Sequence, residues 1–443
     1  MNWKPFPNRY HEDVPTSTPC NSSGCGELAR GGPITSAGST AWSHARHVCR
    51  AVHGRLAGAV ASGGRVIVND NTGRRLVLFD STFKLLSVIA DTTSATAHAY
   101  GSDFGGLIAY RGDSSLFVDP GMLSMFVIDP DGRIVRTMAA PQPNEVNFLI
   151  GGPYGTPGLD AQGRLVYKAR VGGIMKITPR VVPGQPPPPD ILDSAMVVRF
   201  DFSTRKTDTV AKFIGPQFVV HTSVDENRWL TMIRIVNPLP WIDDWALLAD
   251  GTVAIVHGRE YRVDYFDANG RMTTTAKLPF DWQRLNDTDK EAIIDSTRAA
   301  IDAADSAAGR PTAPQRKADS ARIARRMAAP EQTMAPRTGT SGGGGAANLT
   351  SLTQVIALNE LPDYLPPFRL AAARGDRDGN LWIRTTKVVN GGAVYDVING
   401  QGVLIDRIQV PPGRVIAGFG PGGVVYMGVL DGAIARIERA RVR

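Results

Sequence analysis

The chain has 443 residues, a formal net charge of +7 at pH 7, 42% hydrophobic residues, 47 glycines and 31 prolines. This is the composition of a globular protein with many turns, and it contains no apolar run of about 18 residues that would predict a transmembrane helix. The positive charge is spread over turns and strand ends without interleaved aromatic residues, so we expect no nucleic-acid partner.

Residues 1–54 are predicted to be an irregular N-terminal segment, because they are rich in Ser, Thr, Gly and Pro and show no sustained periodicity. They also lack the basic and then apolar order of a secretion signal, so the residues alone predict a cytoplasmic location. All three cysteines lie here, and CNSSGC (20–25) does not have the Cys-x2-Cys spacing of a zinc knuckle. We therefore expect neither a disulfide framework nor a bound metal in this segment.

From residue 55 onwards, short alternating strands are separated by turn residues, and groups of four strands recur. The clearest group is 245–278, where Asp250-Gly251 and Asn269-Gly270 supply the turn positions that antiparallel strands need. Four strands in about 40 residues match one blade of a β-propeller. The sequence therefore predicts an all-β fold, a six-bladed β-propeller of four-stranded blades over 55–443. The groups cover 55–90, 107–138, 155–213, 245–278, 369–410 and 415–438.

The third strand of each group ends on a short polar or acidic residue. Its side chain is expected to cap the following turn by accepting hydrogen bonds from backbone N–H groups. These residues are Asp80, Asp129, Asp201, Asp267, Asn399 and Glu438. The last group lacks a clear fourth strand, so either a strand from before residue 55 completes it or the last blade has three strands.

Two stretches lie outside the repeat. Residues 218–236 are predicted to form a β-hairpin, and 286–350 form an insertion between blades four and five. The insertion begins with helical periodicity over 287–308, capped by Asn286 or Asp287. It continues as an Ala-, Pro- and Gly-rich segment typical of a disordered linker.

Several motifs resemble those of bacterial NHL-like six-bladed propeller proteins, which are common in Gemmatimonadota. They include GGLIAYRGDSSLFVDP (105–120), NPLPWIDDWALLADGTVAIVHGREYRVDYFDANG (237–270) and VIAGFGPGGVVYM (415–427). The resemblance covers 55–443 and implies an extracytoplasmic location, either periplasmic or secreted. It carries no particular activity over to this chain.

In a propeller, the loops from strand four to the next strand one share a face with the loops from strand two to strand three. That face surrounds the central channel, so we expect a binding site there. The first set of loops supplies the candidates His98, Tyr100, Asp103, Tyr154, Trp241, Asp243, Asp244 and Tyr364, and the second set supplies His257, Arg259 and Arg384.

Within this set, 241–244 and 257–259 are the positions that the repeat itself does not require. Trp241 follows Pro238 and Pro240. It is a candidate wall of the channel mouth for a carbohydrate or a peptide, and the alternative is plain packing.

Three functions stay open. The first is non-catalytic binding of a small molecule, carbohydrate, peptide or protein on the channel face, without a cofactor. The second is a calcium-dependent lactone or ester hydrolase of the gluconolactonase-like type, with calcium held by oxygens of Asn69, Asp70, Asp119 and Asp244. The competing interpretation is that these side chains cap turns. The third is a structural or assembly role, which predicts an exposed apolar patch.

Overall fold

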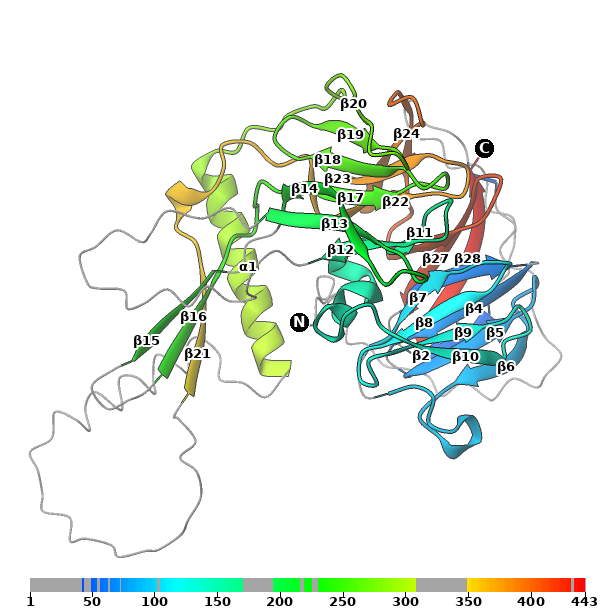
Figure 1. Ribbon diagram of the computed structural model, residues 1–443. Coiled ribbons are helices and arrows are strands. Elements are labelled where there is room, and N and C mark those ends of the chain that lie inside the picture. The colour runs from blue at the N-terminus through cyan, green and yellow to red at the C-terminus, as the bar shows by residue number, and fades with distance from the viewer. Residues whose placement is uncertain are drawn as a thin grey trace, which may run out of the picture.

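The computed structural model describes residues 42–43, 49–53, 56–62, 64–71, 73–101, 104–169, 194–215, 219–224, 230–307, 349–431 and 434–442. In this part of the chain, six antiparallel sheets follow one another in sequence and are arranged in a ring (Figure 1). Apolar clusters fill the interfaces between successive sheets, and one cluster joins the sixth sheet to the first. The prediction of an all-β, six-bladed propeller is confirmed.

The strands of each blade pair in chain order, and blade six receives its outermost strands from the N-terminal segment. Blade one consists of β3 (Leu56–Ser62), β4 (Arg65–Asp70), β5 (Arg75–Phe79) and β6 (Leu85–Ala90). Blade two consists of β7 (Gly106–Ala109), β8 (Ser115–Asp119), β9 (Ser124–Ile128) and β10 (Ile134–Ala139). Blade three consists of β11 (Gly158–Leu159), β12 (Leu165–Ala169), β13 (Ser194–Phe200) and β14 (Thr207–Ile214). Blade four consists of β17 (Asp244–Leu247), β18 (Val253–His257), β19 (Arg262–Phe266) and β20 (Met272–Thr274). Blade five consists of β22 (Phe368–Gly375), β23 (Leu381–Val389), β24 (Gly392–Ile398) and β25 (Leu404–Gln409). Blade six consists of β26 (Arg414–Phe419), β27 (Val424–Asp431) and β28 (Ile434–Val442), with β1 (Trp42–Ser43) and β2 (Cys49–His53).

The middle strands of a blade are buried on both faces, because each blade packs against a neighbour on either side. Every residue of β8 is buried, whereas most residues of the outer strand β10 are exposed. Second strands such as VAIVH in β18 are therefore nearly continuous apolar runs, the pattern of a strand between two packed layers.

The predicted turn caps are present at all but one of the six positions. Asp129, for example, accepts hydrogen bonds from the backbone N–H groups of Asp131 (3.0 Å) and Arg133 (2.8 Å). The prediction for Glu438 is wrong, because β28 continues past this residue and Glu438 instead forms an ion pair with Arg414 (2.7 Å). The other caps are Asp80, Asp201, Asp267 and Asn399.

Two strands from the N-terminal segment complete blade six. β1 and β2 both pair with β28 in antiparallel register, so the first and last strands of the chain close the ring together. The prediction that 1–54 is irregular is therefore wrong for 42–43 and 49–53. The physical reason is that the edge of β28 offers unpaired backbone groups, which a short segment can satisfy without a strong pattern of its own. Cys20 and Cys25 lie outside the described residues.

The insertion and the predicted hairpin stand to one side of the ring (Figure 1). The helix α1 (Asp287–Ala307) matches the predicted range, and Asn286 caps it by accepting the N–H of Asp289 at 2.9 Å. The hairpin consists of β15 (Val219–Val224) and β16 (Leu230–Val236), to which β21 (Leu349–Val355) adds in parallel. The low-complexity residues 308–348 lie outside the described residues.

Short 3-10 helices occupy several connections: η1 (Ser94–Thr96), η2 (Pro143–Ile150), η3 (Gly152–Tyr154) and η4 (Leu358–Glu360). None of the helices in the described ranges combines the length and the apolar character that crossing a membrane requires.

Removal of β1 and β2 exposes the edge of β28 and the core beneath it. A chain that begins at residue 54 is therefore expected to unfold at a lower temperature and a lower urea concentration than a chain that begins at residue 42. Calorimetry and urea titration of the two chains measure the difference. Equal midpoints would contradict the role of these strands in closing the ring.

Candidate functional site

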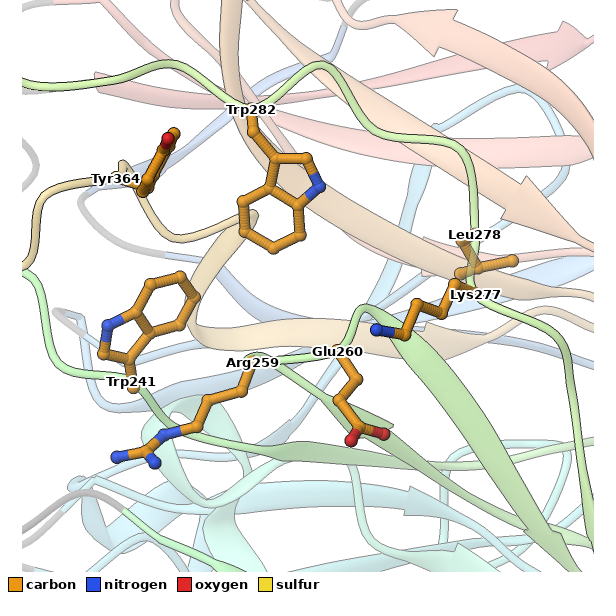
Figure 2. Close-up of a pocket in the computed structure, with 7 residues that line it drawn as sticks. All are labelled: Trp241, Arg259, Glu260, Lys277, Leu278, Trp282 and Tyr364. Atoms are coloured by element: carbon orange, nitrogen blue, oxygen red, sulfur yellow. The ribbon is translucent and has the colours of Figure 1, made fainter.

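A pocket of about 350 Å³ lies where blades four and five meet (Figure 2). Its walls come from the connection before β17, the turn between β18 and β19, and the segments that flank the insertion. These are strand-four-to-strand-one and strand-two-to-strand-three connections, which belong to the channel face of a propeller. The lining residues are Trp241, Arg259, Glu260, Lys277, Leu278, Trp282 and Tyr364. The pocket thus brings together three of the predicted site residues, Trp241, Arg259 and Tyr364.

Trp282 and Tyr364 are held by an antiparallel bridge between the two ends of the insertion. Backbone hydrogen bonds of 2.8 and 2.9 Å connect 283–285 to 363–365. The bridge places two aromatic residues that are far apart in sequence on the same side of the pocket (Figure 2).

Helix α1 fastens this bridge to the ring. Lys290 in its first turn is buried, and its amine donates a hydrogen bond to Asp363 at 2.8 Å. This bond and the positive charge lower the pKa of the Asp363 carboxyl group. An apolar cluster beneath the bridge joins α1 to the connections before β17 and β22. Its buried members are Leu239, Leu285, Ile294 and Leu361.

The aromatic residues form a continuous series from the pocket into the core. The Trp241 and Trp282 rings have centroids 6.0 Å apart and are tilted by 41°. Trp282 meets Phe280 edge-on at 5.3 Å, and Phe280 meets the buried Tyr261 at the same distance. Trp282 is nevertheless 38% exposed and Tyr364 is 44% exposed. The packed series holds the indole of Trp282 in place while one part of its surface faces solvent.

The charged side chains at the pocket differ in whether they form ion pairs. Glu260 forms an ion pair with Arg262, and this hydrogen bond lowers the pKa of Glu260. Arg259 and Lys277 make no ion pair with any carboxylate in the described ranges. In Figure 2 the amine of Lys277 extends toward the space below Trp282, and Arg259 lies beside Trp241. Among the described residues, the rim of the pocket therefore carries two cations without an ion-pair partner, and the charge of Lys277 also contributes to the lowered pKa of Glu260.

Behind the β18–β19 turn, His257 lies between two carboxylates. Its Nδ1 is 3.2 Å from Asp243 and its Nε2 is 2.7 Å from Asp264. The hydrogen bond to Asp243 raises the pKa of His257; burial opposes this, and the bond to Asp264 adds to it. Burial favours a higher pKa for Asp264, but hydrogen bonds from Thr274 and His257 outweigh it and lower the value. The two carboxylates therefore favour the protonated form of His257.

Asp243 and Asp244 connect three blades. Asp243 accepts the N–H of Ile214 at the end of blade three (3.1 Å) and that of Gly258 in the β18–β19 turn (3.2 Å). The buried carboxylate of Asp244 accepts the N–H groups of Trp245, Ala372 and Ala373, at 2.9, 2.6 and 3.0 Å, and so joins blade four to blade five. Burial raises the pKa of Asp244 to about 6, against the effect of these hydrogen bonds.

Two cations, Lys168 and Arg374, interact electrostatically with the buried Asp244. Burial lowers the pKa of Lys168 on β12, and the charge of Asp244 acts in the opposite direction. Arg374 on β22 donates to the carbonyl of Ile416 at 2.7 Å, which links blade five to blade six. The predicted site residue Arg384 is exposed on β23, outside the pocket, and its charge adds to the effect of burial in lowering the pKa of Arg374.

The other predicted site residues lie apart from the pocket. The Tyr100 hydroxyl is buried within 2.9 Å of the Asn69 amide oxygen, and burial raises its pKa to about 12. His98 is exposed, with a ring nitrogen 2.5 Å from the carbonyl of Thr92. The Tyr154 carbonyl accepts the indole N–H of Trp245 at 2.9 Å. Asp103 lies outside the described residues.

The side-chain oxygens predicted as calcium ligands accept hydrogen bonds from other groups of the protein. The Asp70 carboxylate accepts the N–H of Gly73 and a hydrogen bond from Arg75, at 2.9 and 3.0 Å. Asp119 accepts the N–H groups of Gly101 and Gly121, at 2.8 and 2.9 Å. In the described ranges, no group of three or more His, Cys, Asp or Glu side chains is placed to hold a metal ion. The hydrogen bonds of Asp70, Asp119 and Asp244 are those of turn caps and strand ties.

The sequence did not predict Glu260, Lys277, Leu278 or Trp282 as pocket residues. Lys277 and Trp282 follow the last strand of blade four, so they lie in a strand-four-to-strand-one connection, which is expected on the channel face. They were missed because the insertion separates them from β22 by about 90 residues of sequence, and the bridge brings this segment beside Tyr364.

The ring of six blades defines the class of the protein, a six-bladed β-propeller. The chain matches no protein-family model and no curated protein sequence. Similar solved structures include a gluconolactonase from Xanthomonas campestris, with 11% identity, TM-score 0.40, and coverage of 94% of this chain and 100% of that chain. A streptogramin B lyase has 10% identity, TM-score 0.36, and coverage of 90% and 97%. The calcium-binding protein regucalcin from Agrobacterium tumefaciens has 11% identity, TM-score 0.37, and coverage of 92% and 95%.

Replacement of Asp244 tests its role as a tie between blades. In Asp244→Ala, three buried N–H groups lose their acceptor, and at 1–3 kcal/mol for each unsatisfied group we expect a loss of about 3 kcal/mol or more in unfolding free energy. Asp250→Ala is the control, because Asp250 caps an exposed turn and its loss is expected to cost about 1 kcal/mol or less. Urea titration measures both, and similar losses would contradict this assignment.

The raised pKa of His257 predicts a pH-dependent stability. Its contribution is fully present below the ordinary value of 6.5 and is lost as pH rises through the raised value of the folded state. Unfolding free energies of the wild type and His257→Gln, measured from about pH 5.5 to about pH 9, are expected to converge toward high pH. A constant difference would show that His257 is not held as a cation.

Proposed function

We propose that the protein binds an organic ligand in the pocket lined by Trp241, Trp282 and Tyr364, on the channel face and without catalysis. The observation that carries this proposal is an aromatic surface that is exposed and yet held rigidly. Large exposed aromatic side chains in a concave site are typical of binding surfaces, because their burial by a partner supplies much of the binding free energy.

The size of the pocket favours a small ligand or one segment of a longer ligand. A volume of about 350 Å³ lies at the lower end of the range for small-molecule sites. The mixture of flat apolar surface and a few charged groups is also that of such sites, in which the polar groups fix the orientation of the ligand. A carbohydrate, a peptide segment or a small molecule fits this description better than the broad face of a protein.

The absence of catalysis is supported by the state of the most reactive group near the pocket. A general base needs a free nitrogen, but both ring nitrogens of His257 face carboxylates, those of Asp243 and Asp264. The calcium-dependent hydrolase stays a prediction that requires oxygens converging on one ion.

Two further predictions accompany this proposal. The assembly role is supported by exposed apolar residues on the outer strands β6 and β10, such as Leu86 and Val135, which are 47% and 58% exposed. The resemblance to extracytoplasmic NHL-like propellers supports a site of action outside the cytoplasm.

The test uses ligand-detected NMR with a mixed set of oligosaccharides, aromatic acids and short peptides. At least one class is expected to bind the wild type and to lose about tenfold or more in affinity with Trp282→Ala, since truncation of a central aromatic contact costs about 2 kcal/mol and about 1.4 kcal/mol is a factor of ten. Phe104→Ala is the matched control, because Phe104 is 49% exposed and does not line the pocket. Unchanged melting temperatures verify the fold of both variants.

Two outcomes would contradict the proposal. In one, no probe binds with an affinity that depends on Trp241 or Trp282. In the other, the bound probe is chemically converted at a rate that Trp282→Ala lowers, which would make the pocket an active site.

A further inference from the structure

We infer that the ligand of this pocket is an acidic saccharide, a sugar chain whose units carry carboxylates. This inference rests on the proposed binding function and names the class of ligand. It follows from the geometry of the two indoles, the unpaired cations at the rim and the exposure of the lining residues.

The two indoles present a surface across which a ligand lies. Their centroids are 6.0 Å apart, and a stacked aromatic pair alone needs about 4.5–7 Å between centroids, so no third ring fits between them. The tilt of 41° also prevents a parallel slot for a flat aromatic ligand. A pyranose ring lies well on such a surface, because its partly positive C–H groups meet the negative faces of the indoles.

The charges select an acidic ligand. Glu260 already has Arg262 as an ion-pair partner, which it shares with Asp264, whereas Arg259 and Lys277 form no ion pair with a carboxylate in the described part of the chain. The guanidinium of an arginine matches a carboxylate with two parallel hydrogen bonds, and lysine adds a second positive charge. A cationic ligand would meet both charges unfavourably, and a neutral sugar would use neither of them.

The exposure of the walls favours a chain over a single sugar. Arg259, Glu260, Lys277, Trp282 and Tyr364 are all exposed, so the pocket does not enclose its ligand. The Tyr364 hydroxyl and the Glu260 carboxylate provide polar groups for sugar hydroxyls at the rim. An extended ligand can therefore pass through the pocket while one or two of its units contact the aromatic surface.

The experiment compares acidic oligosaccharides with their uncharged counterparts. Tetramers of galacturonate, glucuronate, mannuronate and guluronate, and the methyl ester of each, are titrated against the wild type by calorimetry. For at least one of them, the acid is expected to bind about tenfold more tightly than the ester, because esterification removes the charge-assisted hydrogen bonds and retains the ring faces.

Variants identify the groups responsible. The double variant Arg259→Gln, Lys277→Gln is expected to reduce the preference for acid over ester to about twofold or less, with little change in the affinity for the ester. The matched control is Arg271→Gln, Lys84→Gln. Both of these cations are exposed, and they lie in the turns between third and fourth strands, at the opposite end of the blades. The control is expected to keep the full preference.

The outcomes separate this inference from the proposed function. Equal affinity for acid and ester, or no uronate binding while another probe still requires Trp282, overturns the acidic saccharide and leaves the binding function standing. Tighter binding of an aromatic acid such as indole-3-acetate than of any uronate does the same. Binding of uronates that is insensitive to Trp282→Ala overturns the acidic saccharide, and it overturns the binding function as well when no other probe depends on Trp241 or Trp282.

Discussion

The two adjacent carboxylates of Asp243 and Asp244 hold together the part of the ring that carries the pocket. Side chains of neighbouring residues in an extended segment point to opposite sides, so one carboxylate serves blade three and the β18–β19 turn while the other serves blade five. Each accepts backbone N–H groups that would be costly to leave unpaired. Trp241 precedes this pair by two residues, so its position follows from the same hydrogen bonds.

The second support of the pocket comes from the insertion. A long excursion between two blades is tolerated because it leaves the ring at a connection and returns to the next inner strand. Here the excursion is closed at its base by the bridge between 283–285 and 363–365 and by the ion pair of Lys290 with Asp363. The connections of a rigid scaffold thereby carry well-fixed aromatic side chains, which is the arrangement that a specific binding site needs.

Local patterns in the sequence predicted the parts of the fold that depend on local physics. Strand alternation, Asp-Gly and Asn-Gly turns and the Asn286 cap act over a few residues, and the corresponding blades and helix were predicted with nearly the observed limits. Pairing between distant segments was not predictable in this way. The pairing of β2 with β28, the parallel addition of β21 to β16, and the approach of Trp282 to Tyr364 depend on the closed ring.

The same distinction explains which candidate site residues came together. The repeat pattern does not distinguish one channel-face loop from another, so it predicted Tyr100 and Tyr154 as site residues in the same way as Trp241. Packing separates them, because the Tyr100 hydroxyl is satisfied inside blade one whereas the Trp241 ring faces Trp282 at the surface. A residue whose polar atoms are hydrogen-bonded and whose apolar surface is buried within the fold has few groups available to contact a ligand.

The charged side chains near the pocket also differ in whether they have partners within the fold. The carboxylates of Asp243 and Asp264 flank His257, and Arg262 pairs with both Asp264 and Glu260, so these side chains form one hydrogen-bonded network. Within this network the carboxylates already have hydrogen-bond partners behind the β18–β19 turn. Arg259 and Lys277 form none of these ion pairs in the described part of the chain, although the charge of Lys277 acts on Glu260, and both cations face a ligand at the rim of the aromatic surface.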